Sequence, residues 1–108
     1  MRRGSIVIAA DRGDFSGKPR PYVVVQATAA LEGTTAITLC PITTHLTGAA
    51  LMRVPVLRLD GTGLLEASEI EVDRIRTIRR SRVKAPIGAV SDDILKQVDA
   101  ALRRWLEL

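Results

Sequence analysis

The feature that most constrains the fold is an arginine framed by two prolines and followed at once by a strongly β-forming run. Residues 17–26 read Gly-Lys-Pro-Arg-Pro-Tyr-Val-Val-Val-Gln. Pro19 and Pro21 fix their own φ angles and keep the preceding residues extended, so Arg20 hangs from a stiff backbone. Residues 22–25 are apolar on both faces, which is typical of a central strand. The sequence predicts a phosphate-binding cation at the mouth of a buried strand, although a solvated loop arginine is the simpler interpretation of this stretch alone.

Other short apolar segments predict a β-rich α+β fold. The predicted strands are residues 5–10, 20–27, 35–42, 52–59, 67–75 and 85–90. Pro55 predicts that the fourth strand lies at an edge or contains a bulge. After Ser91, which can cap a helix, apolar residues recur at the spacing of one helical face. These elements predict a small SH3-like antiparallel β-barrel, or a strongly bent sheet, with a C-terminal amphipathic helix packed on it.

The composition predicts one globular domain spanning residues 1–108. Apolar residues make up 46% of the chain, which argues against intrinsic disorder. The only aromatic residues are Phe15, Tyr22 and Trp105, so an aromatic base-stacking platform is not expected. Thirteen arginines, three lysines and a net charge of +4 favour a nucleic-acid partner, because guanidinium groups bind phosphates bidentately.

Cys40 is the only cysteine and His45 the only histidine. A disulfide framework is therefore excluded, and a Cys/His zinc site has too few ligands. Cys40 lies in an apolar strand and is interpreted as a small core residue. The N-terminal charges are not followed by a signal-peptide core, and no run reaches transmembrane length, so the expected location is the cytoplasm.

Three polar groups fall at the ends of predicted strands, which converge in a small barrel. They are Arg20, the run Thr43-Thr44-His45, and the pair Asp73-Arg74. Phosphoryl transfer without a metal needs a cation for the developing charge and hydrogen-bond donors on the phosphoryl oxygens. Arg20 and Thr43 are the candidates for these two roles, and no strong general base is evident. His45 is kept as a candidate for substrate positioning, although a surface residue is its simpler interpretation.

Two charged runs follow in the second half of the chain. Glu69, Glu71 and Asp73 alternate with apolar residues, which predicts a half-buried strand with a solvated row of carboxylates. Only convergence of all three carboxylates would make a metal site. The second run, named here the basic strip, comprises Arg74, Arg76, Arg79, Arg80, Arg82 and Lys84. It is either a solvated face or a nucleic-acid footprint.

Motifs in the same order along nearly the whole chain resemble those of the MazF/PemK toxins, the ribonuclease components of toxin–antitoxin pairs. They are Arg3-Gly4-x-Ile6-Val7, Arg20-Pro21-x-Val23-Val24-Val25, Pro41-Ile42-Thr43, Ile75-Arg76-Thr77-Ile78, and Ile87-Gly88-x-Val90-Ser91-Asp92 leading into Val98-Asp99-x-Ala101-Leu102. Each motif alone is weak, and the ordered set is fairly specific. The chain departs from the family at Ser5, where many members carry Asp, and at Glu71, where one subgroup carries arginine.

The resemblance implies an SH3-like barrel that forms homodimers and cleaves single-stranded RNA at short sequences without a metal or other cofactor. The ribose 2′-hydroxyl attacks the adjacent phosphate, leaving a cyclic phosphate and a 5′-hydroxyl. The resemblance implies that Arg20 acts in proton transfer or charge stabilisation and that Thr43 binds the phosphate in the transition state. It also implies that Asp73 matches an acidic residue that some members use near the scissile bond.

Two other functions remain open. CcdB-like toxins of the same fold poison DNA gyrase through an aromatic tail, but here Trp105 falls on the apolar stripe of the helix and is expected in the core. A basic β-barrel that binds RNA without cleaving it is the third alternative. Incubation of the pure protein with single-stranded RNA in EDTA distinguishes the three functions.

The resemblance also implies a protein partner, because toxins of this family are inhibited by an antitoxin with an acidic, partly disordered segment. The basic strip offers that segment and RNA the same electrostatic target. Lys18 and Thr44 flank the two candidate catalytic residues and are expected to contribute to the same surface. No membrane partner is expected.

Overall fold

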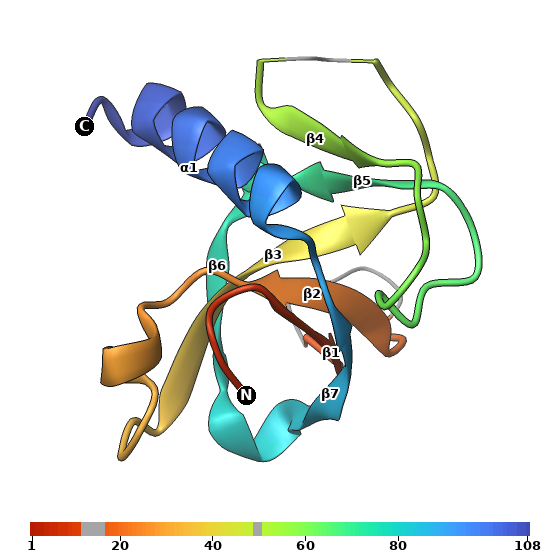
Figure 1. The fold of residues 1–108 in the computed structure, drawn as a ribbon. Helices are drawn as coiled ribbons and strands as arrows, with labels where there is room; N and C mark the ends of the chain where they lie inside the picture. Colours follow the sequence, from red (N-terminus) through yellow and green to blue (C-terminus); the bar gives the residue numbers. More distant parts are fainter. Residues whose placement is uncertain (12–16, 49–50) are drawn as a thin grey trace.

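The computed structural model describes residues 1–11, 17–48 and 51–108 and shows a bent antiparallel sheet with one helix packed on it (Figure 1). The strands are β1 (Ser5–Ala9), β2 (Arg20–Val24), β3 (Ala36–Thr43), β4 (Arg53–Val56), β5 (Ser68–Glu71), β6 (Arg76–Arg79) and β7 (Val83–Ala89). Three 3₁₀ turns are η1 (Thr28–Ala30), η2 (Val72–Arg74) and η3 (Arg80–Arg82), and the helix is α1 (Asp92–Leu106). The predicted fold class is confirmed.

The sheet curls as a barrel does, but hydrogen bonds do not close it. Within the described residues its strand order is β4-β5-β3-β2-β1-β7, with β6 also paired to β3. The outer strands β4 and β7 are therefore not paired with each other. The prediction for Pro55 is confirmed, because β4 is an edge strand and an edge tolerates a residue without an N–H group.

Strand β3 connects the two halves of the sheet. Its register with β2 pairs Tyr22 with Pro41 and Val24 with Leu39. Along its other edge it pairs first with β6, over residues 36–39, and then with β5, over residues 42–43. The end of β3 therefore lies between β2 and β5, with Pro41 paired to β2 and Thr43 paired to β5.

Apolar side chains fill both faces of the sheet. One cluster lies under α1 and contains Val23, Cys40, Ile70 and the helix residue Val98 among its members. The other lies on the opposite face and contains the neighbouring Val24. Adjacent residues of β2 thus point into different clusters, which confirms the prediction of a central strand buried on both sides.

The helix begins as its sequence predicts. The Ser91 hydroxyl accepts a hydrogen bond from the Ile94 N–H group at 3.2 Å, and acidic residues occupy the first turn. The prediction for Trp105 is wrong, because this side chain is 45% exposed. The reason is length: the last turn of α1 extends beyond the sheet, so none of the strands in the described residues covers that end of its apolar stripe (Figure 1).

Two further predictions about the chain after residue 67 need correction. The strand predicted over 67–75 ends at Glu71, where the chain enters η2. The carboxylate row is not solvated, since Glu69 is 4% and Glu71 is 5% exposed. Polar partners explain this burial: Glu69 accepts hydrogen bonds and Glu71 forms ion pairs. An alternating sequence pattern alone does not reveal these partners.

The turn at residues 60–63 packs directly on β7. The Ala89 N–H group donates to the Gly61 carbonyl at 3.0 Å, and a Cβ atom on Gly88 would lie 2.3 Å from the Thr62 carbonyl carbon. Only glycine allows this approach of two backbones. The contact holds the following residues, 63–66, against the end of the sheet.

No helix in the part of the chain that the structure describes is long and apolar enough to cross a membrane.

Cys40 is fully buried between strands and helix, as the sequence predicts. Burial, with a smaller effect of the Asp73 charge, raises the pKa of its thiol from 9.0 to about 12. The buried neutral thiol therefore contributes stability that is complete below pH 9 and is lost as the pH rises from 9 towards 12.

We predict that Cys40 of the native protein reacts at least about 100-fold more slowly with an aromatic disulfide reagent at pH 8 than the denatured protein does, because burial suppresses the thiolate and blocks access. Absorbance of the released thiol measures both rates. Equal rates in buffer and in guanidinium chloride would contradict the buried position.

Candidate functional site

The fold brings Arg20 and Thr43 together at one end of the sheet. Continuing the β2–β3 register beyond the Tyr22–Pro41 pair places Arg20 opposite Thr43, and residues directly opposite point to the same face. Both residues line one cavity of about 520 Å³, together with Thr44. A volume of this order is typical of small-ligand sites. We call it the Arg20 cavity.

The lining of the Arg20 cavity combines polar and apolar residues. Arg20, Thr43 and Thr44 supply a cation and two hydroxyl groups. Apolar residues from five different segments also line it: Ile8, Pro21, Ile42, Leu64, Leu65 and Ile87. Gly63, Glu66 and Ser68 complete the lining, so the turn held against β7 supplies one wall. An anion beside Arg20 and a flat apolar group against the apolar residues would match this lining.

The Thr43 hydroxyl is oriented by the backbone. Its oxygen accepts a hydrogen bond from the His45 N–H group at 3.1 Å. A hydroxyl that accepts one bond keeps its own hydrogen for donation, so Thr43 is prepared to donate to a phosphoryl oxygen. The His45 side chain is exposed and does not line the cavity. His45 contributes to the site through its backbone.

Glu69 was not predicted as a site residue, yet it holds the segment that follows Thr43. Its carboxylate accepts hydrogen bonds from the Thr47 N–H group at 3.0 Å, the Thr47 hydroxyl at 2.9 Å and the Gly48 N–H group at 2.9 Å. Burial opposes the charged form, but these bonds outweigh it and lower the pKa of Glu69. The sequence showed only that Glu69 lies in an alternating strand, and this pattern does not indicate which residues the carboxylate binds.

The other two acidic residues of the run, Glu71 and Asp73, both pair with Arg53. Asp73 accepts a forked pair of bonds from Arg53 at 2.8 and 3.2 Å, and Glu71 lies 3.1 Å from the same guanidinium. The bond to Asp73 raises the pKa of Arg53. Arg74 lies 3.4 Å from Glu71. Asp73 does not line the Arg20 cavity, and its carboxylate is engaged by Arg53.

The three carboxylates of this run do not converge, and the described ranges 1–11, 17–48 and 51–108 contain no cluster of three His, Cys, Asp or Glu side chains suited to a metal ion.

The structure divides the basic strip into separate groups. Arg76 pairs with Asp11 at 2.9 Å, and Arg80 donates to the Leu31 and Thr34 carbonyls. Arg79 is exposed and lies opposite Ala36, at the start of β3. Thr43 is at the other end of β3, roughly 23 Å of extended chain away. Arg79 and the Arg20 cavity therefore cannot hold the same phosphate.

Lys84, at the start of β7, is nearer to the site. Its neighbour Val83 pairs with Ala9, which in turn pairs with Arg20. With strands about 4.8 Å apart, the backbone of Lys84 lies roughly 10 Å from that of Arg20. Lys84 and Lys18 are both exposed, as a contact surface around the cavity requires.

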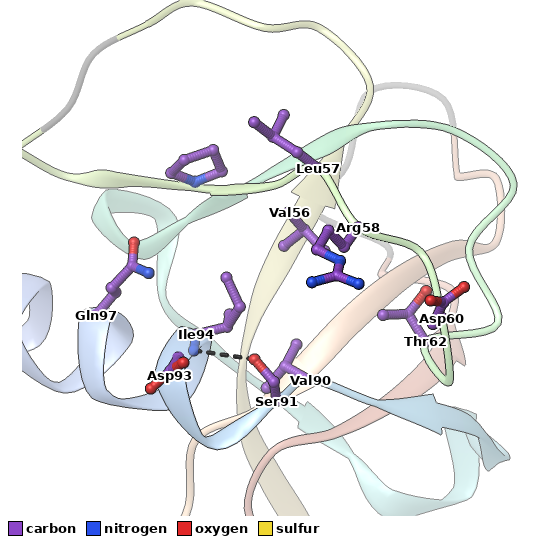
Figure 2. Close-up of a pocket in the computed structure, with 11 residues that line it drawn as sticks. Val56, Leu57, Arg58, Asp60, Thr62, Val90, Ser91, Asp93, Ile94 and Gln97 are labelled. Carbon is purple, nitrogen blue, oxygen red and sulfur yellow. Dashed lines mark hydrogen bonds between the residues drawn. The ribbon is translucent and has the colours of Figure 1, made fainter.

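A second cavity, also of about 520 Å³, lies between β4, the turn at residues 60–62 and the start of α1 (Figure 2). Figure 2 shows the Arg58 guanidinium inside it, with Asp60 beside Thr62 on one side and Asp93 on the helix. An anionic ligand there would be attracted by Arg58 but repelled by the carboxylates of Asp60 and Asp93. The Arg20 cavity suits a phosphate better, because its lining combines one cation and two threonine hydroxyl groups with a single carboxylate, that of Glu66.

Comparison with known families agrees with this geometry. A family model for the PemK-like, MazF-like toxins of type II toxin–antitoxin systems matches residues 2–106. The chain belongs to this family. The predicted MazF/PemK resemblance is confirmed, and it extends over nearly the whole chain.

Two curated relatives of this MazF/PemK chain come from mycobacteria. One, from Mycolicibacterium smegmatis, is named a probable endoribonuclease MazF and is 35% identical over 106 residues, covering 98% of this chain and 96% of the relative. The other, endoribonuclease MazF9 of Mycobacterium tuberculosis, is 35% identical over 116 residues and covers 100% and 98%. The prediction of an endoribonuclease agrees with both names.

Solved structures show the same MazF/PemK fold. The Mycobacterium tuberculosis toxin MazF-mt6 superposes with a TM-score of 0.82 at 26% identity, covering 96% of this chain and 97% of that one. A MazE–MazF complex from Deinococcus radiodurans superposes with a TM-score of 0.81 at 23% identity, covering 100% and 97%. A mycobacterial endoribonuclease in complex with its cognate antitoxin gives 0.81 at 20% identity, covering 100% and 96%.

Proposed function

We propose that this MazF-type toxin is an endoribonuclease that cleaves single-stranded RNA at short sequences, without a metal ion, by attack of a ribose 2′-hydroxyl on the adjacent phosphate. The observation that carries the proposal is the shared cavity of Arg20 and Thr43. It places a permanent cation and a hydroxyl donor on two neighbouring strands, which is the arrangement that a pentacoordinate phosphorane needs.

In the proposed reaction the bond between the 2′-oxygen and phosphorus forms, and the bond between phosphorus and the 5′-oxygen breaks. The 2′-hydroxyl loses its proton to water, and the departing 5′-oxygen takes a proton from water. Arg20 stabilises the extra negative charge on the phosphoryl oxygens, because its guanidinium stays protonated at neutral pH. Thr43 donates its hydroxyl hydrogen to one of those oxygens. The products are a 2′,3′-cyclic phosphate and a 5′-hydroxyl.

The apolar residues of the cavity lining support sequence selectivity. A nucleobase beside the scissile phosphate would lie against Ile8, Ile42 and Ile87, which contact its faces without reading its edges. Glu66, which also lines the cavity, carries an acceptor that suits a base with exocyclic or ring N–H groups. The apolar residues would select for the size and shape of the base, and Glu66 would select for its hydrogen-bond donors.

We also propose an antitoxin partner with an acidic, partly disordered segment. Similar folds have been solved as toxin–antitoxin complexes. The exposed cations Lys18, Arg79 and Lys84 would attract an acidic segment as well as RNA. Such a segment would inhibit cleavage by covering the approach to the Arg20 cavity.

We predict that Arg20→Ala lowers kcat by about two to three orders of magnitude, the usual effect of losing a preorganised transition-state donor, with little change in thermal stability. A fluorogenic single-stranded RNA in excess EDTA measures cleavage without metal ions. Arg79→Ala, at the far end of β3, is the matched control and should keep wild-type kcat. Full activity of a folded Arg20→Ala protein would exclude the catalytic role, and binding without cleavage by the wild type would indicate an RNA-binding protein.

We predict that reversing Arg79 and Lys84 together to Glu weakens RNA binding and lowers the slope of log affinity against log salt by roughly 0.7 for each phosphate that the variant no longer binds. Cleavage at saturating RNA should be unchanged, because both residues lie outside the cavity lining. Fluorescence anisotropy over a salt series measures the slope. An unchanged affinity and slope would show that these cations serve only solubility. Arg80 is left intact, since its guanidinium holds the 31–34 turn.

We predict a homodimer at micromolar concentration. Exposed apolar side chains gather at the end of α1, and the Arg104 guanidinium donates to the Leu51 carbonyl there, which brings Leu51 alongside. The exposed residues are Leu51, Trp105, Leu106 and Leu108. A second subunit would remove this surface from water. Sedimentation velocity measures the mass, and a monomer at these concentrations would refute the prediction.

A further inference from the structure

Three adjacent strands place a cation, a hydroxyl and a carboxylate in one row. The β2–β3 register leads to Arg20 opposite Thr43, and the β3–β5 register pairs Thr43 with Glu69. Residues opposite each other in antiparallel strands share a face and have Cβ atoms about 5 Å apart. Glu69 is therefore the next residue along the row that begins at the Arg20 cavity.

The Glu69 carboxylate holds the chain beyond Thr43. It accepts hydrogen bonds from the Thr47 N–H group, the Thr47 hydroxyl and the Gly48 N–H group. The side chain is 4% exposed, so water competes little for these bonds. The segment from Thr43 to Gly48 is thus fixed at one end by the sheet and at the other by Glu69.

The catalytic hydroxyl is oriented from within that same segment. The His45 N–H group donates to the Thr43 oxygen, and His45 lies between the two fixed ends. If Thr47 and Gly48 move, His45 moves with them, and the Thr43 hydroxyl loses the bond that directs its hydrogen into the cavity. Small displacements of this kind reduce catalysis without abolishing substrate binding.

We propose that Glu69 is a positioning residue for the cleavage reaction: by fixing Thr47 and Gly48 it holds the His45 N–H group on Thr43 and so directs the Thr43 hydroxyl at the scissile phosphate. This inference rests on the proposed function. It differs from the usual role of an acidic residue near RNA, because Glu69 neither touches the substrate nor exchanges a proton with it.

Glu71 provides the matched control. It lies two residues from Glu69 on the same strand, is 5% exposed, and forms its ion pairs with Arg53 and Arg74. Neither of these partners lines the Arg20 cavity. Replacing either buried glutamate should lower thermal stability, so loss of stability alone does not distinguish the two residues. The effect on kcat at saturating RNA does.

The experiment compares Glu69→Gln, Glu69→Asp and Glu71→Gln in the fluorogenic RNA assay, with the folded fraction measured by circular dichroism at the assay temperature. We expect Glu69→Gln to lower kcat about tenfold with KM within about twofold. Glu69→Asp should recover part of the loss, because it keeps the charged acceptor. Glu71→Gln should keep wild-type kcat per folded molecule.

Several outcomes would overturn the inference. A folded Glu69→Gln protein with kcat within about twofold of wild type would do so, as would an equal loss in Glu69→Gln and Glu71→Gln. If Glu69→Gln does not fold, Thr47→Val decides, since it removes one of the three bonds: a kcat lowered about threefold supports the inference, and an unchanged kcat overturns it. Full activity of Arg20→Ala would instead remove the proposed site, whereas an inactive Arg20→Ala beside an active Glu69→Gln would refute the positioning role alone.

Discussion

The antiparallel register of β3 is the constraint on which the rest of this structure depends. This strand pairs with β2 along one edge and with β6 and then β5 along the other, so its last residue, Thr43, lies between two strand ends. A shift of one residue would turn Thr43 to the opposite face and move its apolar neighbours out of their clusters. The two buried faces therefore enforce the register, and the register brings the hydroxyl to the same cavity as Arg20.

Buried charge on β5 illustrates how the site tolerates acidic residues near a proposed anionic substrate. Glu69 is satisfied by three hydrogen-bond donors, and Glu71 by two guanidinium groups. The positive charge or dipoles of such partners offset much of the electric field of the carboxylate. An unpaired carboxylate has no such offset. These two charges therefore act on the protein backbone and on Arg53, and Arg20 remains the cation in the cavity lining.

The proposed RNA path has two distinct parts. The proposed chemistry belongs to the cavity at the end of β2 and β3, where apolar residues lie beside Arg20 and Thr43 in the lining. The more distant cations, such as Arg79 at the start of β3, act in solvent and supply long-range attraction that salt screens. Because of this separation, we expect cleavage at saturation and salt-dependent affinity to be changed by different residues.

Much of the fold was readable from local pattern alone. The apolar run after Pro21, the Pro55 edge strand and the Ser91 cap are set by neighbours in the chain, and all three predictions are confirmed. The candidate pair Arg20 and Thr43 came from strand ends and a family resemblance. The structure places both in one cavity, while their catalytic roles stay predictions.

What only the tertiary structure decided is which charge meets which partner. An alternating strand predicts solvated carboxylates, but Glu69 accepts bonds from residues 21 and 22 positions away and Glu71 pairs with a strand that precedes it. The helical period likewise places Trp105 on an apolar stripe, although α1 outruns the sheet that would cover it. Local sequence determines period, turns and caps because those depend on near neighbours; burial of charge depends on contacts that exist only once distant segments meet.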